Sequence, residues 1–457
     1  MKYVCVDYYS HITNLGSMKK ILNIILISCF SLIVISCAKK DSSSSSSTTT
    51  TTTISSLQYI DIIDAESLFI VPGSSSSRSV SRSSYASSTT NTLFKITETG
   101  AVQEVGYKDE DNNTYTVTSQ PVSIDNVDTN YVVFSFGSDK INPTECYLTN
   151  KSTGAVYLLG SAVSQLESKC PVPQFDSKDK MILSDNKSNF YYHYYAPISG
   201  ASFYYLRQVN YTDPTSISAS QYIIDSESVN RFIVDSNGNV AYTAYTTAGY
   251  ANTAVNRIRK SNGGYYNLDI HTSYWIGLDG NIYLEALSDE VKKVSIDSDY
   301  NVSISSYDNI TASCNCRITN QHYKLKLSNK LIFVKPGDDS TIAIDNGTEI
   351  RTLDLPLSKI SIARSSSNYA YISGTDNSSS NTVLVKFNPS DNSSSQMYTK
   401  GTYDIYNFNV TSDDNITFSA LRMNDGKKVL GKILADGTLS ITDESINKQI
   451  TILERIR

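Results

Sequence analysis

Cysteines are the side chains with the most chemistry to offer in this chain, and four of its seven lie in the main body: Cys146, Cys170, Cys314 and Cys316. Four cysteines allow three disulfide pairings. We favour a bond between Cys146 and Cys170, which would close a moderate loop. Cys314 and Cys316 would form a tight, strained bridge, and such bridges are reduced more easily. Because the spacing lacks the paired Cys-x2–4-Cys of zinc sites, we expect structural bridges or free thiols and no metal.

Aromatic side chains form the second candidate site, in the segment Phe190-Tyr191-Tyr192-His193-Tyr194-Tyr195. Ring faces and hydroxyls on Tyr191, Tyr192, Tyr194 and Tyr195 suit a sugar or peptide ligand. Alternate residues of a strand point to opposite faces, so half of these rings would fill the space between layers. We expect packing to be their main role and keep a ligand platform as the alternative.

No set of residues matches a catalytic or cofactor motif. Gly-x-Ser-x-Gly, the phosphate-binding P-loop and His-Glu-x-x-His are absent, and the chain holds four histidines in all. Asp109, Asp111 and Asn113 have the spacing that opens a calcium loop, but Thr114 and Gln120 stand where that loop needs Gly and Glu. The sequence therefore predicts no catalytic, cofactor-binding or metal-binding residue.

Residues 18–37 have the pattern of a secretory signal peptide. Lys19 and Lys20 precede an apolar run of 16 residues, Ile21 to Ser36, which is short for a membrane span of about 20 residues. The 17 residues before Met18 contain Asp7 and no apolar core, so we expect the true start at Met18.

The end of this segment, Val34-Ile35-Ser36-Cys37, resembles the lipobox of bacterial lipoprotein precursors. The resemblance implies that Cys37 receives a diacylglycerol, that the leader is removed and that the new amine is acylated, for example with palmitate. Leu26-Ile27-Ser28-Cys29 also fits the box, but it would leave only eight residues of apolar core. Ala38 in place of Asp after the cysteine implies sorting to the outer membrane of the cell envelope, on its periplasmic or its surface side.

Three segments are predicted along the chain: a signal peptide at 1–37, a tether at 38–54 and a folded body at 55–457. The tether holds the runs Ser42–Ser47 and Thr48–Thr53, which cannot bury a core. The body carries a Ser-rich insertion at 74–92.

The body consists of short runs of Val, Ile, Tyr, Phe and Thr between Gly, Asn and Asp turns, which predicts β-strands in hairpins. These strands recur in groups of four. The residues that open each second strand are Asn130, Lys180, Asn239, Asn281, Lys330, Asn368 and Asn415, which span 285 residues in six steps, about 47 each. A weaker first copy lies at Glu66–Val71. The turns between third and fourth strands fall at Gly100, Gly154, Asp213-Pro214, Gly263, Asp299, Gly347, Asp391 and Gly437.

Such a repeat resembles the blades of β-propeller proteins, and it implies seven or eight four-stranded blades. Tandem β-sandwiches are the alternative all-β fold, but sandwiches do not usually recur every 47 residues. No propeller subfamily signature is present, since Trp275 is the only tryptophan and the paired glycines of kelch repeats are missing.

Composition agrees with an exported strand-and-turn protein. Charged residues make up 18% of the chain and the formal net charge is −6, so the broad basic surface of a nucleic-acid binder is absent. We expect a non-catalytic lipoprotein that contacts the membrane through its anchor and binds a protein or glycan partner, without a cofactor. The alternative is an extracytoplasmic propeller enzyme acting on glycans or peptides, which would need two carboxylates, or a histidine and a carboxylate, in one pocket.

Overall fold

The computed structural model describes the strands of the body and most of the turns between them. The described residues are 59–71, 91–108, 114–115, 121–137, 143–164, 167–168, 170–172, 182–185, 187–198, 201–219, 227–246, 254–268, 273–285, 291–306, 324–334, 340–365, 368–411, 413–443 and 452–455. The predicted signal peptide, Cys37 and the tether lie outside them. No helix among these residues is long and apolar enough to cross a membrane.

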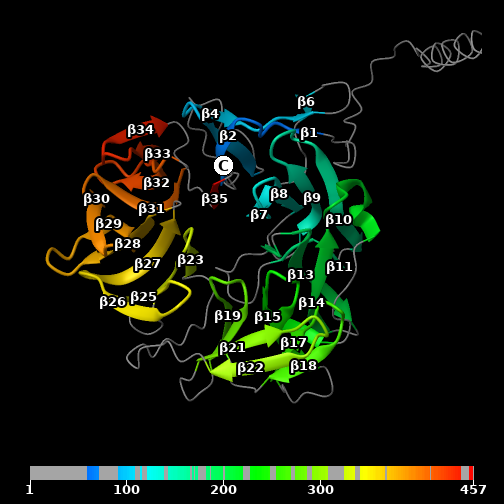
Figure 1. Ribbon diagram of the computed structural model, residues 1–457. Coiled ribbons are helices and arrows are strands. Elements are labelled where there is room, and N and C mark those ends of the chain that lie inside the picture. The colour runs from blue at the N-terminus through cyan, green and yellow to red at the C-terminus, as the bar shows by residue number, and fades with distance from the viewer. Residues whose placement is uncertain are drawn as a thin grey trace, which may run out of the picture. The chain divides into compact units, whose positions relative to one another are not determined.

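Antiparallel sheets follow one another along the chain and stand as eight blades around a common centre (Figure 1). Blade 1 comprises β35 (Ile452–Arg455), β2 (Ala65–Val71), β3 (Thr92–Thr97) and β4 (Val102–Glu104). Blade 2 comprises β7 (Pro121–Asn126), β8 (Tyr131–Gly137), β9 (Pro143–Asn150) and β10 (Val156–Ser164). Blade 3 comprises β11 (Glu167–Ser168), β12 (Ile182–Ser184), β13 (Asn189–Ile198) and β14 (Ala201–Asn210), followed by the 3₁₀ helix η2 (Pro214–Ala219). Strand β11 pairs with both β10 and β13, so blades 2 and 3 are joined in one eight-stranded sheet.

Blades 4 to 8 are regular four-stranded meanders. Blade 4 comprises β15 (Glu227–Val234), β16 (Val240–Thr246), β17 (Ala254–Arg259) and β18 (Tyr265–Leu268), and blade 5 comprises β19 (Ser273–Ile276), β20 (Ile282–Glu285), β21 (Val291–Ile296) and β22 (Val302–Ser306). Blade 6 comprises β23 (Lys324–Lys326), β24 (Leu331–Val334), β25 (Thr341–Asp345) and β26 (Ile350–Asp354). Blade 7 comprises β27 (Leu357–Ser365), β28 (Ala370–Asp376), β29 (Thr382–Asn388) and β30 (Ser393–Thr399), and blade 8 comprises β31 (Tyr403–Val410), β32 (Ile416–Arg422), β33 (Lys428–Ile433) and β34 (Leu439–Asp443).

The two ends of the described body close the ring. The C-terminal strand β35 pairs antiparallel with β2, with Ser67 opposite Arg455 and Ile70 opposite Ile452. Blade 1 thus takes one strand from the end of the chain and three from its beginning. A small separate sheet of β1 (Tyr59–Ile60), β5 (Tyr107–Lys108) and β6 (Thr114–Tyr115) lies beside blade 2, where Tyr59 bridges Ala155.

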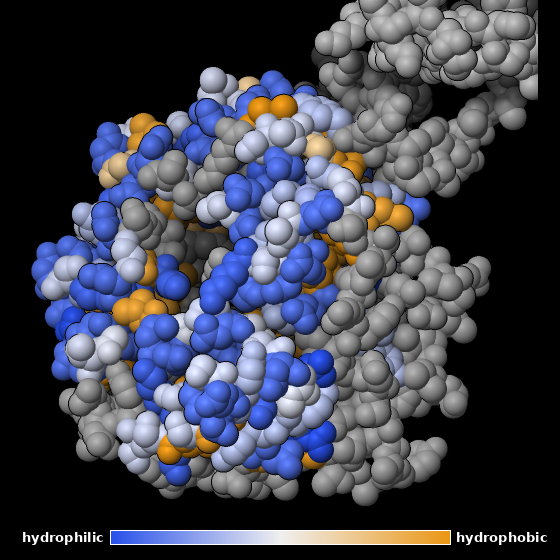
Figure 2. Space-filling model, turned by 45° about the vertical axis from the view of Figure 1, so that its right-hand side comes forward, coloured by the Kyte–Doolittle hydropathy of each residue, from blue (hydrophilic) through white to orange (hydrophobic). Residues whose placement is uncertain are grey.

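The cores lie between neighbouring blades, because a blade is covered on both faces. Blades 7 and 8 share one such core, which includes Tyr371, Phe408 and Phe418. Trp275 of blade 5 is buried against Tyr283, with ring centroids 5.6 Å apart, and belongs to a core shared with blade 6. Burial on both faces explains continuous apolar strands and the low charged fraction. On the face seen in Figure 2, the apolar residues of the described part lie scattered among hydrophilic ones.

The predicted propeller is confirmed, with eight blades, and the alternative of tandem sandwiches is wrong. Seven of the eight turns expected between third and fourth strands are found there. The eighth, Asp213-Pro214, opens η2 instead. Lys180 lies outside the described residues, and the second strand of blade 3 begins at Asn189, because the short β12 precedes a long β13–β14 hairpin of ten residues a strand.

Candidate functional site

Five-residue turns with the pattern Asp-x-x-x-Asn recur at one face of the ring, which we call the turn face because it carries the first-to-second and third-to-fourth strand turns. The pairs are Asp185 with Asn189, Asp235 with Asn239, and Asp297 with Asn301. In each, the Asn main-chain N–H donates to Asp Oδ1 and the Asn side-chain amide donates to Asp Oδ2, at 2.8, 2.7 and 3.0 Å for the amide bond. These carboxylates therefore hold turns.

The pKa values of Asp235 and Asp297 are shifted in opposite directions. Burial raises the pKa of Asp235 despite the hydrogen bonds from Asn239. Asp297 is exposed, and the hydrogen bonds from the side chain and main chain of Asn301 lower its pKa. The turn is thus the same in a buried and an exposed setting, which indicates that its geometry comes from the local sequence.

Polar bonds also cross from blade to blade at the turn face. They join Lys187 Nζ to Asn237 Oδ1 (3.2 Å), Lys260 Nζ to the Tyr300 carbonyl (3.0 Å), Lys330 Nζ to the Pro389 carbonyl (3.1 Å), the Tyr371 hydroxyl to the Asp414 carbonyl (3.3 Å) and Lys432 Nζ to Glu66 Oε2 (3.0 Å). The first four bonds reach a turn of the following blade, and the fifth reaches Glu66 in strand β2 of blade 1, so neighbouring blades are linked at this face.

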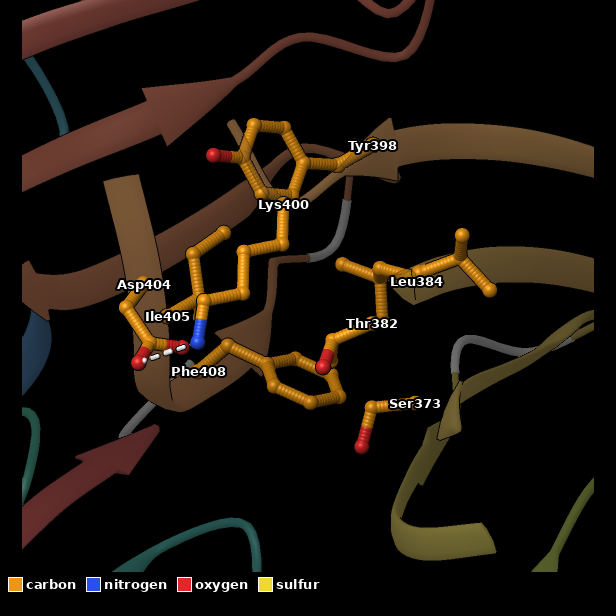
Figure 3. A pocket seen from close by; sticks show the side chains of 9 residues that line it. Ser373, Thr382, Leu384, Tyr398, Lys400, Asp404, Ile405 and Phe408 are labelled. Atoms are coloured by element: carbon orange, nitrogen blue, oxygen red, sulfur yellow. Dashed lines mark hydrogen bonds and ion pairs between the residues drawn. The ribbon is translucent and has the colours of Figure 1, made fainter. Parts of the chain in front are cut away.

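A pocket opens between blades 7 and 8 at the other ends of their strands (Figure 3). It is lined by residues from β28, β29, the end of β30, the connection to β31 and β31 itself. Buried apolar side chains, among them Leu384 and Phe408, form its inner wall, and the hydroxyls of Ser373 and Thr382 lie along one side. The space measures about 340 Å³ only when the open solvent at its mouth is counted, and its enclosed part has room for about one water molecule.

An ion pair marks the polar end of this pocket. Lys400 Nζ lies 2.7 Å from Asp404 Oδ2, with both side chains partly exposed (Figure 3). The connection that carries them is fixed by Tyr398, whose hydroxyl donates to the Tyr403 carbonyl at 2.5 Å and accepts from the Tyr403 N–H at 3.2 Å. The positions of the two charges are therefore set by main-chain geometry.

This arrangement combines one charged pair with an apolar wall. The described residues of the pocket include one ammonium and one carboxylate, which pair with each other, and no histidine or second carboxylate is among them. A ligand that binds at the mouth of this shallow pocket can direct a polar or charged end to the ion pair. Within the described part of the chain, no three His, Cys, Asp or Glu side chains gather as metal ligands.

The tyrosine segment is part of the packing. Tyr191, Tyr192 and Tyr194 are buried in β13, and burial raises the pKa of the Tyr191 hydroxyl. The Tyr192 hydroxyl accepts from the buried Arg207 at 2.9 Å, and the Tyr194 ring stacks on Tyr205 with centroids 5.4 Å apart. These three rings form no exposed platform, while the Tyr195 side chain lies outside the described part of the structure.

Cys146 of β9 and Cys170, just after β11, form a disulfide with Cα atoms 5.5 Å apart. This is the pairing favoured by the loop length. Both residues are fully buried, and the bond ties blade 2 to the start of blade 3. Cys37, Cys314 and Cys316 lie outside the described residues, as do the positions with calcium-loop spacing, Asp109, Asp111 and Asn113.

Sequence reasoning missed the pocket residues Lys400 and Asp404. Lys400 follows the end of β30 and Asp404 lies at the start of β31, with a turn between them. Their separation of four residues therefore matches neither a strand nor a helix period. The only signal in the sequence was a basic residue at the end of one blade's fourth strand, followed by an acidic residue in the first strand of the next blade. The other residues that line the pocket come from both blades, 7 and 8.

Comparison with known proteins adds little beyond the fold. No protein family and no curated protein matches the chain. Among solved structures, puromycin hydrolase aligns at 10% identity with a TM-score of 0.40, over 73% of this chain and 57% of its own length. A 6-phosphogluconolactonase-like protein of Bacteroides fragilis, described as a putative enzyme, aligns at 11% and 0.36, over 69% of this chain and 95% of that one.

The propeller domain of the Trilobed protease from Pyrococcus furiosus aligns at 9% identity with a TM-score of 0.38, over 72% of this chain and 98% of that one. Scores this low support no inference about activity. The fold is instead established by the strand pairing and by the closure of β35 onto β2. The chain is an eight-bladed β-propeller.

Proposed function

We propose that this protein is an exported lipoprotein, anchored to the cell envelope through Cys37, whose propeller binds a partner without catalysing a reaction. The observation that carries the export step is the buried disulfide between Cys146 and Cys170. Disulfides form and persist in oxidising compartments and are rare in the cytosol. The bond therefore supports independently the destination that the lipobox implies.

Binding through the pocket of blades 7 and 8 is the second part of the proposal. Its apolar inner wall and its single ion pair provide contacts for a ligand but no acid–base couple. Propellers also present their variable connections on a rigid scaffold, and connections positioned in this way commonly carry recognition. We therefore assign partner binding to this pocket.

Metabolic labelling with a palmitate analogue tests the anchor. Full-length protein should take up the label, and a Cys37→Ala variant should lose both the label and its place in the membrane fraction. Cys29→Ala is the matched control and should be labelled normally. Label retained by Cys37→Ala would contradict the assignment.

Site-specific photo-crosslinking in intact cells tests the pocket. A photoreactive residue at the exposed Thr382, beside the pocket, should give a discrete crosslinked product. The same residue at Asp436, in an exposed turn of the opposite face, serves as the control and should not give that product. The product should weaken in a Lys400→Met background, and its absence at Thr382 would argue against a partner there.

Incubating the protein with panels of peptides and glycans tests the proposal that it catalyses no reaction. We expect no turnover of any of these compounds. Turnover that an Asp404→Asn variant abolishes would show an active site in this pocket and would replace the proposal with the enzyme alternative.

A further inference from the structure

Blade 8 has two faces of different character. The face turned toward blade 7 contributes a continuous apolar set to their shared core, which comprises Phe408, Val410, Ile416, Phe418, Ala420, Val429 and Ile433. On the face turned toward blade 1, Leu430 is the one buried apolar residue that blade 8 contributes within the described part of the chain. It joins Phe69 and Phe94 of blade 1. The seam between blades 8 and 1 is therefore apolar mainly on the blade 1 side.

Polar side chains occupy the rest of that face of blade 8. Asn409 pairs directly with Thr417, which pairs with Lys432, so these three residues share a sheet face. Asn409 Nδ2 donates to Ser67 Oγ of blade 1 at 3.1 Å, and Lys432 Nζ lies 3.0 Å from Glu66 Oε2. This part of the seam is thus held by hydrogen bonds and an ion pair rather than by apolar packing.

Two buried hydroxyls of this seam, those of Thr417 and Ser419, have no hydrogen-bond partner among the described residues. Burying a hydroxyl without a partner costs free energy that is recovered when the group meets water. Hydroxyls without such a partner also occur at Ser123 and Ser135, on the face of blade 2 that bears Cys146. That seam, however, is held closed by a disulfide and by a continuous sheet.

The chain crosses the seam between blades 8 and 1 differently from the other seven seams. Elsewhere it runs from the fourth strand of one blade into the first strand of the next, whose remaining strands follow in the chain. In blade 1, by contrast, β2 to β4 come from the other end of the chain (Figure 1). Among the described strands, they are joined to β35 only by four residue pairs between β35 and β2. Blade 8 and β35 can therefore separate from β2 without stretching a connection at this seam.

We infer that the ring opens reversibly between blades 8 and 1, with β35 leaving β2, while the other seven seams stay closed. Opening returns the hydroxyls of Thr417 and Ser419 to water. It also uncovers the rings of Phe69 and Phe94, which stack with centroids 5.3 Å apart. Proteins open in part at free energies below that of global unfolding. This seam is a side entrance to the centre of the ring, and it depends neither on the lipid anchor nor on the pocket of blades 7 and 8.

Thiol labelling at two adjacent positions of β32 tests the opening. Ser419→Cys places a thiol in this seam, and Ala420→Cys, the control, places one on the other face of the same strand, in the core of blades 7 and 8. Full-length protein in detergent is treated with a maleimide, and peptide mass spectrometry follows each new cysteine separately from the native ones. Ser419→Cys should react at least about tenfold faster, because only its seam opens. Equal rates would overturn the proposal.

Hydrogen exchange of the wild-type protein gives an answer that does not depend on a variant folding. Strands β2 and β28 are both seven-residue second strands with a paired strand on either side. Amides of β2 should be at least about tenfold less protected than those of β28. Equal protection of the two strands would contradict an opening at β2.

Thr417→Val distinguishes opening of the seam from fraying of β2 alone. The substitution keeps the shape of the side chain and removes a hydroxyl that has no partner, so it should stabilise the closed seam. Exchange of β2 and labelling of Ser419→Cys should both slow by at least about fivefold, which matches the cost of burying such a hydroxyl. If both rates stay at their values without the substitution, β2 frays independently of the seam and the proposal is wrong.

Discussion

Removing the disulfide should destabilise the propeller by an amount set by the loop that it closes. Cys146 and Cys170 are 24 residues apart. Constraining a loop of that length in the unfolded chain contributes about 3.4 kcal/mol at 25 °C in the chain-entropy treatment. Unfolding entropy is roughly 2.1 cal/mol/K per residue, or about 0.8 kcal/mol/K for about 400 residues, so the melting temperature should fall by about 4 °C.

Differential scanning calorimetry of full-length protein, with Cys146→Ser, Cys170→Ser and the double variant, measures this effect. Both single variants should lose as much as the double variant, because either change removes the bond. A reductant should act on the wild-type protein only in denaturant, since both cysteines are fully buried. Melting of the double variant at the wild-type temperature would refute the calculation, and rapid reduction of the native protein would refute the burial.

Three further predictions concern single positions in the framework. Burial lowers the pKa of His193 to about 3, so the unfolded chain, with a histidine pKa near 6.5, binds the proton first as the pH falls. The contribution of His193 to the free energy of unfolding should therefore be fully present above about pH 6.5 and should decline by about 1.4 kcal/mol per pH unit toward pH 3. Free energies of unfolding from urea titrations should show that slope in the wild-type protein and not in His193→Gln. Gly437 and Gly154 both have positive φ, but a Cβ on Gly437 meets nothing within 4 Å, whereas one on Gly154 would meet the Ile60 carbonyl and the Tyr59 ring. Gly437→Ala should cost about 1 kcal/mol and Gly154→Ala about 2 kcal/mol more in urea unfolding, and equal costs would contradict the contact. Lys432→Met should cost about 2 kcal/mol by leaving Glu66 unpaired between blades 8 and 1, and adding Glu66→Gln should recover most of it; a double-mutant cycle without coupling would exclude the ion pair.

The sequence predicted the ring well where turns are encoded locally. Asp and Asn side chains that bond their own turns, together with glycines at positive φ, marked seven of the eight turns between third and fourth strands. Blade 3 was the exception, because a long hairpin and a 3₁₀ helix follow a strand of three residues. There the spacing no longer identified which strand was second.

The sites were harder to predict, for a reason that lies in the architecture. Strand alternation predicts that half of the rings of 190–195 pack between layers, but a propeller blade is covered on both faces, so Tyr191, Tyr192 and Tyr194 are all buried. The pocket combines residues of two blades. Proximity between blades is not encoded in any one segment of sequence.

The pairing of β35 with β2 also determines the order in which the molecule can be completed. During synthesis β2 emerges first, and its partner follows 381 residues after Val71, at Ile452. Until then blade 1 keeps an unpaired edge, and such edges promote aggregation. The first blade made is therefore the last one finished. A chaperone that covers the edge of β2 until β35 has been synthesised would assist the folding of this protein. Chains that stop before Ile452 should be degraded, because their blade 1 lacks a strand.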